Sequence, residues 1–206
     1  MNSNSAAHLP GPGRLEAFSD GVLAIVITLL VLELKTPHLQ AANDAGEALA
    51  ALLALGPKFL GYLLSFFFVA VFWVNHHGFF RLVQRVDAGL LWLNILLLLA
   101  LSFVPFPTGM IGEYPGNAVG LALFALVLMT AGLAFNLMWR HAQARQLYHE
   151  SVSPALVAQA AARGLVGPAL YALAAALAFA LPPAAWALFV VIPLFYVFRR
   201  PGGGAE

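Results

Sequence analysis

Cysteine is absent from this sequence of 206 residues, and charged side chains are scarce. Without cysteine the chain has no disulfides, no thiolate metal ligands and no cysteine nucleophile. Asp, Glu, Lys and Arg make up only 9% of the residues, and the formal net charge is +1. So small a positive charge gives no reason to expect nucleic acid as a partner.

What the sequence has in excess is apolar residues, at 62% of the chain, with a mean hydropathy of +0.86. These values are typical of an all-α integral membrane protein rather than a soluble domain. The apolar residues fall into separate segments, each close to the roughly 20 residues that a helix needs to cross a bilayer. We predict six transmembrane helices, at about 18–34, 57–76, 88–107, 117–139, 164–181 and 183–198.

The two ends of the chain have a different composition from the apolar middle. The N-terminus has neither a basic n-region nor a small-residue cleavage site, so we expect no cleavable signal peptide. Residues 1–13 are expected to be a flexible cytoplasmic N-terminus, 14–199 the transmembrane domain, and 200–206 a polar, glycine-rich cytoplasmic tail.

The distribution of basic residues predicts the orientation, because short loops rich in Lys and Arg stay on the cytoplasmic side. With six spans, only Lys35 and Lys58 fall on the outer side. The other side receives Arg14, Arg81, Arg85, Arg140, Arg145, Arg163, Arg199 and Arg200. This distribution predicts a multi-pass protein of the cell membrane with both termini in the cytoplasm.

Proline and capping residues predict where several helices begin and end. Asp87 and Asn117 are expected to be N-caps, while Pro105 and Pro107 are expected to close the third span. Pro168 should kink the fifth. We also expect a short amphipathic helix after Asn43 or Asp44 in the outer connection 35–56, and an interfacial helix over 153–163.

The first span carries polar residues near its cytoplasmic end, where burial in lipid is costly. On a helical wheel, one stripe contains Arg14, Phe18, Gly21, Ile25, Thr28, Leu29 and Leu32. Ser19 and Asp20 project to either side of this stripe, towards neighbouring helices. Trp73, Asn75, His76 and His77 on span two and Asn94 on span three lie at a similar depth. We therefore expect a hydrogen-bonded cluster among the first three spans.

The residue pattern alone does not decide whether this cluster has a functional role or a purely structural one. Polar side chains in membranes commonly do no more than tie helices together. Phe18, Ile25 and Leu32 are equally compatible with ordinary packing in a helix that is apolar all round.

These residues resemble the transmembrane protein 175 family of potassium channels. The stretch "RLEAFSDGV", with Arg14, Phe18, Ser19 and Asp20, is similar to the family's R-x-x-x-F-S-D signature. The stretch "FWVNHHGFFR" from Phe72 resembles its second helix, and "LLWLNILLLLALSFVPFPT" its third.

The resemblance implies a prokaryotic member with a single six-helix repeat, assembled as a homotetramer whose first helices line a central pore. Ile25, Leu29 and Leu32 would form the hydrophobic constriction, and Thr28 a hydroxyl layer. The implied structural network contains Arg14, Phe18, Ser19, Asp20, Trp73, His76, His77 and Asn94. The implied partners are the chain itself, the lipid bilayer and permeating K⁺ ions, with no cofactor and no metal site. The sequence has no TVGYG-type filter.

Two other function classes are alternatives to a channel. A proton- or cation-coupled secondary transporter would use Asp20 and His76 or His77 as titrating groups, but the sequence shows no repeat of the kind that carriers favour. A membrane enzyme is disfavoured, because the chain has no H-E-x-x-H, no G-x-S-x-G and no cysteine nucleophile.

Overall fold

The computed structural model describes residues 10–41 and 43–198, and nearly all regular structure in this part is helical. Five segments are long and apolar enough to cross a membrane: Gly13–Glu33, Gly56–Phe80, Ala88–Glu113, Ala118–Ala144 and Pro154–Ala180. The expected all-α membrane protein is therefore confirmed. Most of the expected flexible N-terminus, residues 1–9, and the expected tail, 200–206, lie outside the described residues.

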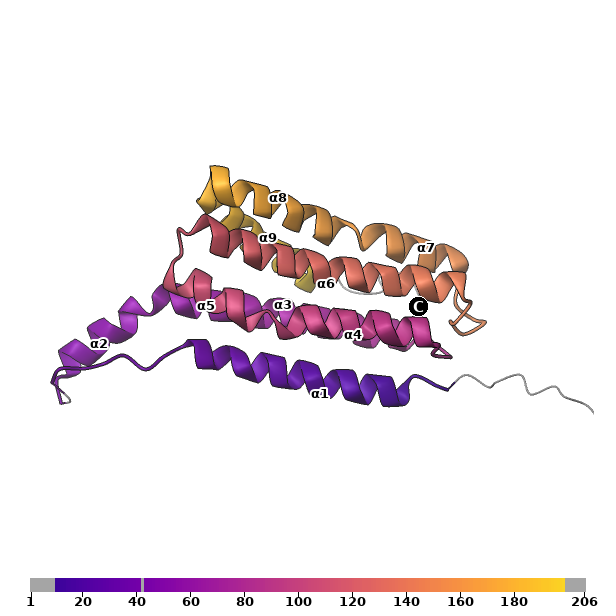
Figure 1. Ribbon diagram of the computed structural model, residues 1–206, viewed down its shortest axis with the longest axis horizontal. Helices are drawn as coiled ribbons and strands as arrows, with labels where there is room; N and C mark the ends of the chain where they lie inside the picture. Colours follow the sequence, from indigo (N-terminus) through magenta and orange to yellow (C-terminus); the bar gives the residue numbers. More distant parts are fainter. Residues whose placement is uncertain (1–9, 42, 199–206) are drawn as a thin grey trace, which may run out of the picture.

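Successive passes run antiparallel along the bundle (Figure 1). Helix α1 (Gly13–Leu29) lies along one edge and tightens into the 3₁₀ turn η1 (Leu30–Glu33). Helix α2 (Ala45–Ala54) projects beyond one end of the bundle, and α3 (Gly56–Phe80) runs back from it. The later elements are α4 (Ala88–Ser102), α5 (Pro105–Glu113), α6 (Ala118–Ala144), α7 (Pro154–Arg163), α8 (Val166–Ala180) and α9 (Pro182–Phe198). Helix α9 coincides with the last expected span, but at 17 residues it is shorter than the five long segments.

The core lies between the later helices and is filled by aromatic rings. Phe68 of α3 packs edge to face against Phe124 of α6 and Tyr171 of α8, with ring centroids 5.8 Å apart in each pair. Phe124 in turn packs against Phe189 of α9 at 5.0 Å. These four buried rings hold α3, α6, α8 and α9 together.

Three helix starts follow from capping chemistry. The Asp87 side chain accepts a hydrogen bond from the backbone N–H of Leu90 at 2.8 Å, and Asn117 accepts one from Gly120 at 2.9 Å. Each satisfies a donor that the first turn of a helix leaves without an internal partner. Both predicted N-caps are confirmed, and Asp44 caps the short helix α2 in the same way.

The prediction that Pro105 and Pro107 close the third span is wrong. The α-helix breaks at Phe103 and Val104, and Pro105 then starts α5, which carries the apolar segment on to Glu113. Proline lacks the N–H that a helix interior needs but is compatible with a first turn. Thr108 of α5 is hydrogen-bonded to Ser65 of α3 at 2.6 Å, which holds the continuation against the bundle.

The segment 153–163, which is expected to be an interfacial helix, forms α7, and one apolar segment of span length runs through both α7 and α8. Helix α7 lies in line with α8 and beside the C-terminal half of α6 (Figure 1). The kink falls at Gly164, four residues before Pro168. In a straight helix the Pro168 ring would clash with the backbone carbonyl of Gly164, which lies four residues earlier. The same ring packs on Gly132 of α6, where an added Cβ would meet it at 2.8 Å.

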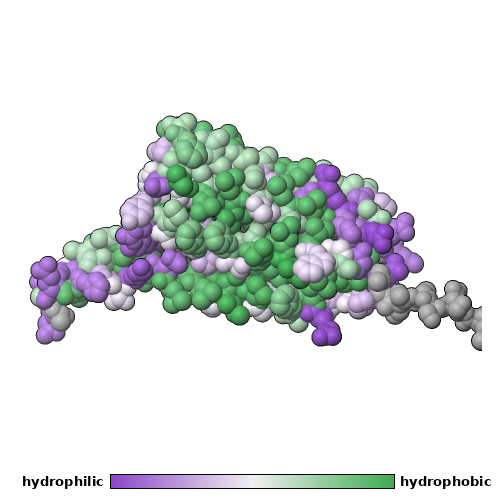
Figure 2. Space-filling view, in the orientation of Figure 1, coloured by the Kyte–Doolittle hydropathy of each residue, from purple (hydrophilic) through white to green (hydrophobic). Residues whose placement is uncertain are grey.

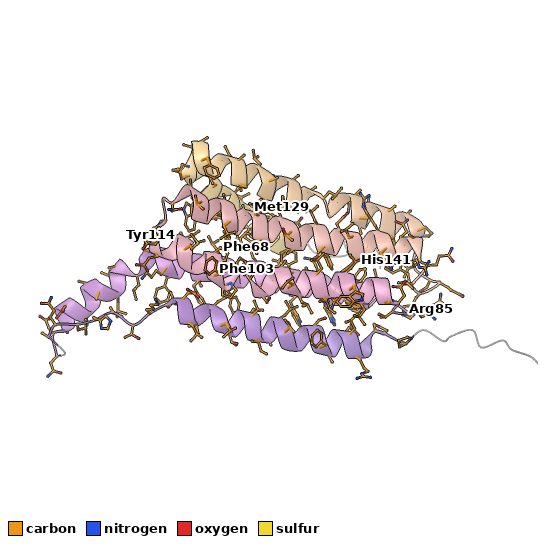
Figure 3. The ribbon with its side chains drawn as sticks, in the orientation of Figure 1. Phe68, Arg85, Phe103, Tyr114, Met129 and His141 are labelled. Atoms are coloured by element: carbon orange, nitrogen blue, oxygen red, sulfur yellow. The ribbon has the colours of Figure 1, made fainter. Side chains whose placement is uncertain are left out.

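Polar residues gather at the two ends of the molecule, with an apolar band between them (Figure 2). Arg85 and His141 lie at one end, and Tyr114 lies at the other (Figure 3). The chain path places Arg14, Arg81 and Arg145 at the end with Arg85, while Lys58 pairs with Glu113 at 2.5 Å at the opposite end. The Arg199 and Arg200 of the predicted charge pattern lie outside the described residues.

Candidate functional site

Helix α1 has one buried face and one exposed face. Ser19, Leu23 and Val26 are buried where α1 packs on α3 and α4, and Leu30 continues this face in η1, which packs on α3 and α5. The four residues have the three- and four-residue spacing of one helical face. On the exposed face, 55% of Phe18, 59% of Ile25 and 67% of Leu32 is accessible. The whole predicted stripe is exposed in the single chain: Arg14, Phe18, Gly21, Ile25, Thr28, Leu29 and Leu32.

Thr28 is the one residue of the stripe whose side chain carries a hydroxyl group. Its Oγ1 donates a hydrogen bond to the backbone carbonyl of Ile25 at 2.9 Å. Because the proton is used within the helix, the oxygen lone pairs are left free to accept from water or to face a cation.

A directional chain of hydrogen bonds joins α3, α4 and α1 through three buried side chains. The His76 Nε2–H donates to Asn94 Oδ1 at 2.8 Å, and Asn94 Nδ2 donates to Ser19 Oγ at 2.9 Å. The Ser19 hydroxyl then donates to the Leu15 carbonyl at 2.8 Å. The acceptor role of Asn94 Oδ1 assigns the proton of His76 to Nε2. Burial makes each of these bonds costly to lose, because an unpaired polar group has no water to replace its partner.

A second link between α1 and α3 runs over the surface. The indole Nε1–H of Trp73 donates to Asp20 Oδ1 at 2.9 Å. The His77 ring stacks on Trp73 with centroids 6.1 Å apart and the planes at 20°. His76 and His77, which are adjacent in sequence, therefore contribute to different links. Asn75 contributes to neither, since its amide donates to the Val71 carbonyl of its own helix at 2.7 Å.

Two residues expected in the network are not brought into it within one chain. Arg14 and Phe18 are exposed on the free face of α1. Within residues 10–41 and 43–198 the Arg14 side chain makes no hydrogen bond or ion pair. A helical wheel could not show that these two side chains lie outside the network, because it gives the direction of a side chain but not the position of its helix at the bundle edge.

A charged cluster at the arginine-rich end was not predicted from the sequence. The Asp87 carboxylate that caps α4 also contacts His141 Nε2 at 2.9 Å and Arg145 Nε at 3.3 Å. Burial raises the pKa of Asp87, but hydrogen bonds from Leu90, His141 and Arg145 outweigh it and leave the pKa below its ordinary value. The spacing of His141 and Arg145, one helical turn apart, was the available signal.

Backbone hydrogen bonds join the loop between α3 and α4 to the loop between α6 and α7. Gln146 follows α6 with φ at 53°, and the N–H of Leu147 donates to the Ala142 carbonyl at 2.9 Å. This is the Schellman arrangement that ends a helix. The Leu147 carbonyl then accepts from the N–H of Gln84 at 2.8 Å in the other loop. The chain leading into α1 joins the same group, because the Val86 N–H donates to the Pro10 carbonyl at 2.9 Å.

Taken together, the fold and the site define a multi-pass helical membrane protein whose first helix is tied to the second and third spans by polar side chains and keeps one apolar face free. The model of one family, described as the endosomal/lysosomal potassium channel TMEM175, matches residues 14–105. A potassium channel of Chamaesiphon minutus is 41% identical over 81% of this chain and 84% of its own length. A potassium channel of Streptomyces collinus is 37% identical over 91% of this chain and 92% of its own length. The chain belongs to the TMEM175 family.

A solved structure shares this fold. It is the crystal structure of a lysosomal potassium-selective channel TMEM175 homolog from Chamaesiphon minutus, which is 37% identical and superimposes with a TM-score of 0.80. The match covers 91% of this chain and 96% of the solved chain.

Proposed function

We propose that this protein is a potassium-permeable, leak-type channel of the cell membrane, with six transmembrane helices per subunit and α1 lining a central pore in a homotetramer. The observation that carries the proposal is the exposed apolar face of α1, opposite a face anchored by buried polar bonds. The relatives of known name that cover most of this chain are potassium channels.

A pore between subunits fits the packing better than a pore within one chain. The middle of the bundle is filled by Phe68, Phe124, Tyr171 and Phe189. Helix α1, by contrast, lies at the bundle edge with one side free (Figure 1). Rotational symmetry would bring four copies of that side together around one axis.

The residues of the free face would then give the pore its chemistry. Rings of Ile25, Leu29 and Leu32 form a narrow apolar constriction that opens and closes by wetting. The Thr28 oxygens form a layer that contacts K⁺ or its hydration water. No cofactor or resident metal is required, since K⁺ is the permeating ion.

The polar network would set the rotation of α1 about its own axis. Ser19 is held through Asn94 and Asp20 through Trp73, so two fixed points define which side chains face the axis. Arg14 and Phe18 lie on the free side and would meet neighbouring subunits rather than α3. The arginine-rich end, and with it both termini, would face the cytoplasm.

The test is reconstitution of the full chain in liposomes with K⁺ and Na⁺ gradients, recording flux and reversal potential. The wild type should pass K⁺ in ohmic single-channel steps. Ile25→Ser should raise the flux and weaken discrimination against Na⁺. The control is Leu99→Ser on α4, which changes a side chain that is 65% exposed and lies outside α1, and it should leave both the flux and the discrimination unchanged.

Saturating flux coupled to a pH gradient would support the transporter alternative and contradict the channel. Equal effects of Ile25→Ser and Leu99→Ser would remove Ile25 from the constriction. Measurement of the subunit number in a membrane-like disc completes the test, because any number other than four contradicts the proposed assembly.

A further inference from the structure

A cavity of about 610 Å³ lies between α3, α6, the α7–α8 segment and α9, on elements that the proposed pore does not use. Its lining is mainly apolar. Phe67, Gly132 and Tyr171 contribute to it from three different elements. We call this cavity the α8 groove.

The α8 groove has a polar end and an apolar end. Asn75, Trp139 and Arg163 line it where their helices approach the arginine-rich end of the molecule. Phe67 on α3 lies eight residues before Asn75, which is about 12 Å deeper into the bundle at 1.5 Å per residue. The groove therefore changes from polar to apolar along the direction in which a lipid changes from headgroup to acyl chain.

Arg163 lies deeper in the bundle than the charges at the end of α6. The carbonyl of Ala161, two residues earlier, accepts a hydrogen bond from Asn136 of α6. Arg140, one turn further towards the arginine-rich end, donates to the same Asn136 side chain at 3.0 Å. Arg163 is thus about 9 Å, more than one helical turn, deeper in the bundle than Arg140, and its long, exposed side chain can extend towards the polar end.

Arg163 carries a charge that has no counterpart in its surroundings. In the part of the chain that the structure describes, no carboxylate lies within ion-pair distance of it, and its guanidinium donates no hydrogen bond. An exposed cation at the polar end of a mainly apolar groove is complementary to an anion with an apolar body. Guanidinium groups bind phosphate oxygens with two parallel hydrogen bonds.

We propose that the α8 groove binds one anionic phospholipid from the leaflet at the arginine-rich end. Its phosphate contacts Arg163, and one acyl chain lies along Phe67 towards Tyr171. Basic pockets between transmembrane helices on the cytoplasmic side are known to bind acidic headgroups. The inference does not depend on ion permeation, because it concerns a face of the subunit away from α1.

The experiment incorporates the full chain into lipid discs with equal phosphatidylglycerol and phosphatidylcholine, extracts it in mild detergent and counts the retained lipids by native mass spectrometry. The wild type should retain phosphatidylglycerol in preference to phosphatidylcholine. Arg163→Gln should lower phosphatidylglycerol retention about fivefold, the size of the attraction between one basic side chain and an anionic surface. Arg163→Lys keeps the charge and should keep most of the preference.

The matched control is Arg81→Gln, which removes the same charge from an exposed position at the same end, outside the groove. It should retain phosphatidylglycerol as the wild type does. Ala70→Phe, which fills part of the apolar lining, should lower retention of both lipids. Helix content and assembly size, measured for each variant, establish that the folds are comparable.

Equal retention of the two lipids by the wild type, or equal losses in Arg163→Gln and Arg81→Gln, would overturn the proposal. Removal of residues 199–206 provides a further test, because these residues follow α9, which lines the groove. Higher phosphatidylglycerol retention after their removal would show that the chain's own end occupies the groove, and the lipid assignment would then be wrong.

Discussion

Ser19 and Asn94 are hydrogen-bonded at 2.9 Å although 75 residues separate them in the sequence, and neither side chain is accessible to solvent. Asn94 is the centre of the contact, because its amide donates to Ser19 on α1 while its oxygen accepts from His76 on α3. One side chain thus fixes three helices relative to each other. An apolar residue of the same size at position 94 would leave His76 Nε2 unpaired and remove the donor to Ser19 Oγ, which would keep only its bond to the Leu15 carbonyl.

Asn94→Ala should lower the free energy of unfolding by about 1–2 kcal/mol, the range of polar contacts between membrane helices. The measurement is unfolding in mixed detergent micelles. Ser102→Ala is the control, because the Ser102 hydroxyl is exposed and donates only to Leu99 of its own helix. A loss no larger than that of Ser102→Ala would show that the buried chain contributes little to stability.

The Asp20–Trp73 contact makes a separate prediction about ion flux. If Asp20 acts by holding α1 against α3, Asp20→Ala and Trp73→Phe should change K⁺ flux in the same direction, and the double variant should be no worse than the more severe single one. Trp92→Phe is the control, since the Trp92 side chain is 68% exposed on α4. A flux change in Asp20→Ala with normal flux in Trp73→Phe would instead mean that the carboxylate acts alone.

Much of this fold is contained in local sequence patterns. Continuous apolar runs predicted the helices, and Asp87 and Asn117 predicted two of their starts, because capping depends on neighbouring residues only. Proline was harder to interpret. Pro105 is compatible with either the end of a helix or the first turn of the next, and only the packing of Thr108 on Ser65 decides between them. Pro168 did predict a break, which falls at Gly164 as its ring geometry requires.

The site residues also divide into those that local periodicity predicts and those that only tertiary packing places. The periodicity of α1 placed Ile25 and Thr28 on one stripe, and that stripe is the exposed face of the helix. Which of two adjacent histidines joins Asn94 depends on the rotation of α3 by one residue, and this is a property of tertiary packing. His76 takes the buried position, while His77 stacks on Trp73. The contact of His141 with Asp87 was equally invisible, since it joins two helices 54 residues apart.

Asp87 makes stability depend on pH in a defined direction. Its pKa in the folded protein lies below the ordinary value of 3.8, because Leu90, His141 and Arg145 donate to the carboxylate. The stabilisation is therefore complete above 3.8 and is lost as the pH falls from there through the lower pKa of the folded state. Asp87→Asn keeps an oxygen that can cap α4 but removes the charge, so its stability should fall less over this range. Unfolding measured across that range, with the exposed Glu150→Gln as control, checks the difference; parallel curves for Asp87→Asn and the wild type would contradict it.

Gln146 is the residue at which a glycine should stabilise the protein. It has a φ of 53°, in the left-handed region where a side chain costs about 1–2 kcal/mol and glycine is free of that cost. The contacts of this turn are made by backbone groups, including the carbonyl that accepts from Arg85 at 3.2 Å, and these survive the change. Gln146→Gly should therefore raise the free energy of unfolding by about 1 kcal/mol.

Gln143→Gly is the matched control, since the same substitution three residues earlier falls inside α6 and should lower stability by about 1 kcal/mol. Opposite signs for the two variants, measured in the same micelles, would show that the turn is strained at Gln146, whereas a loss in both would show that the Gln146 side chain stabilises the turn.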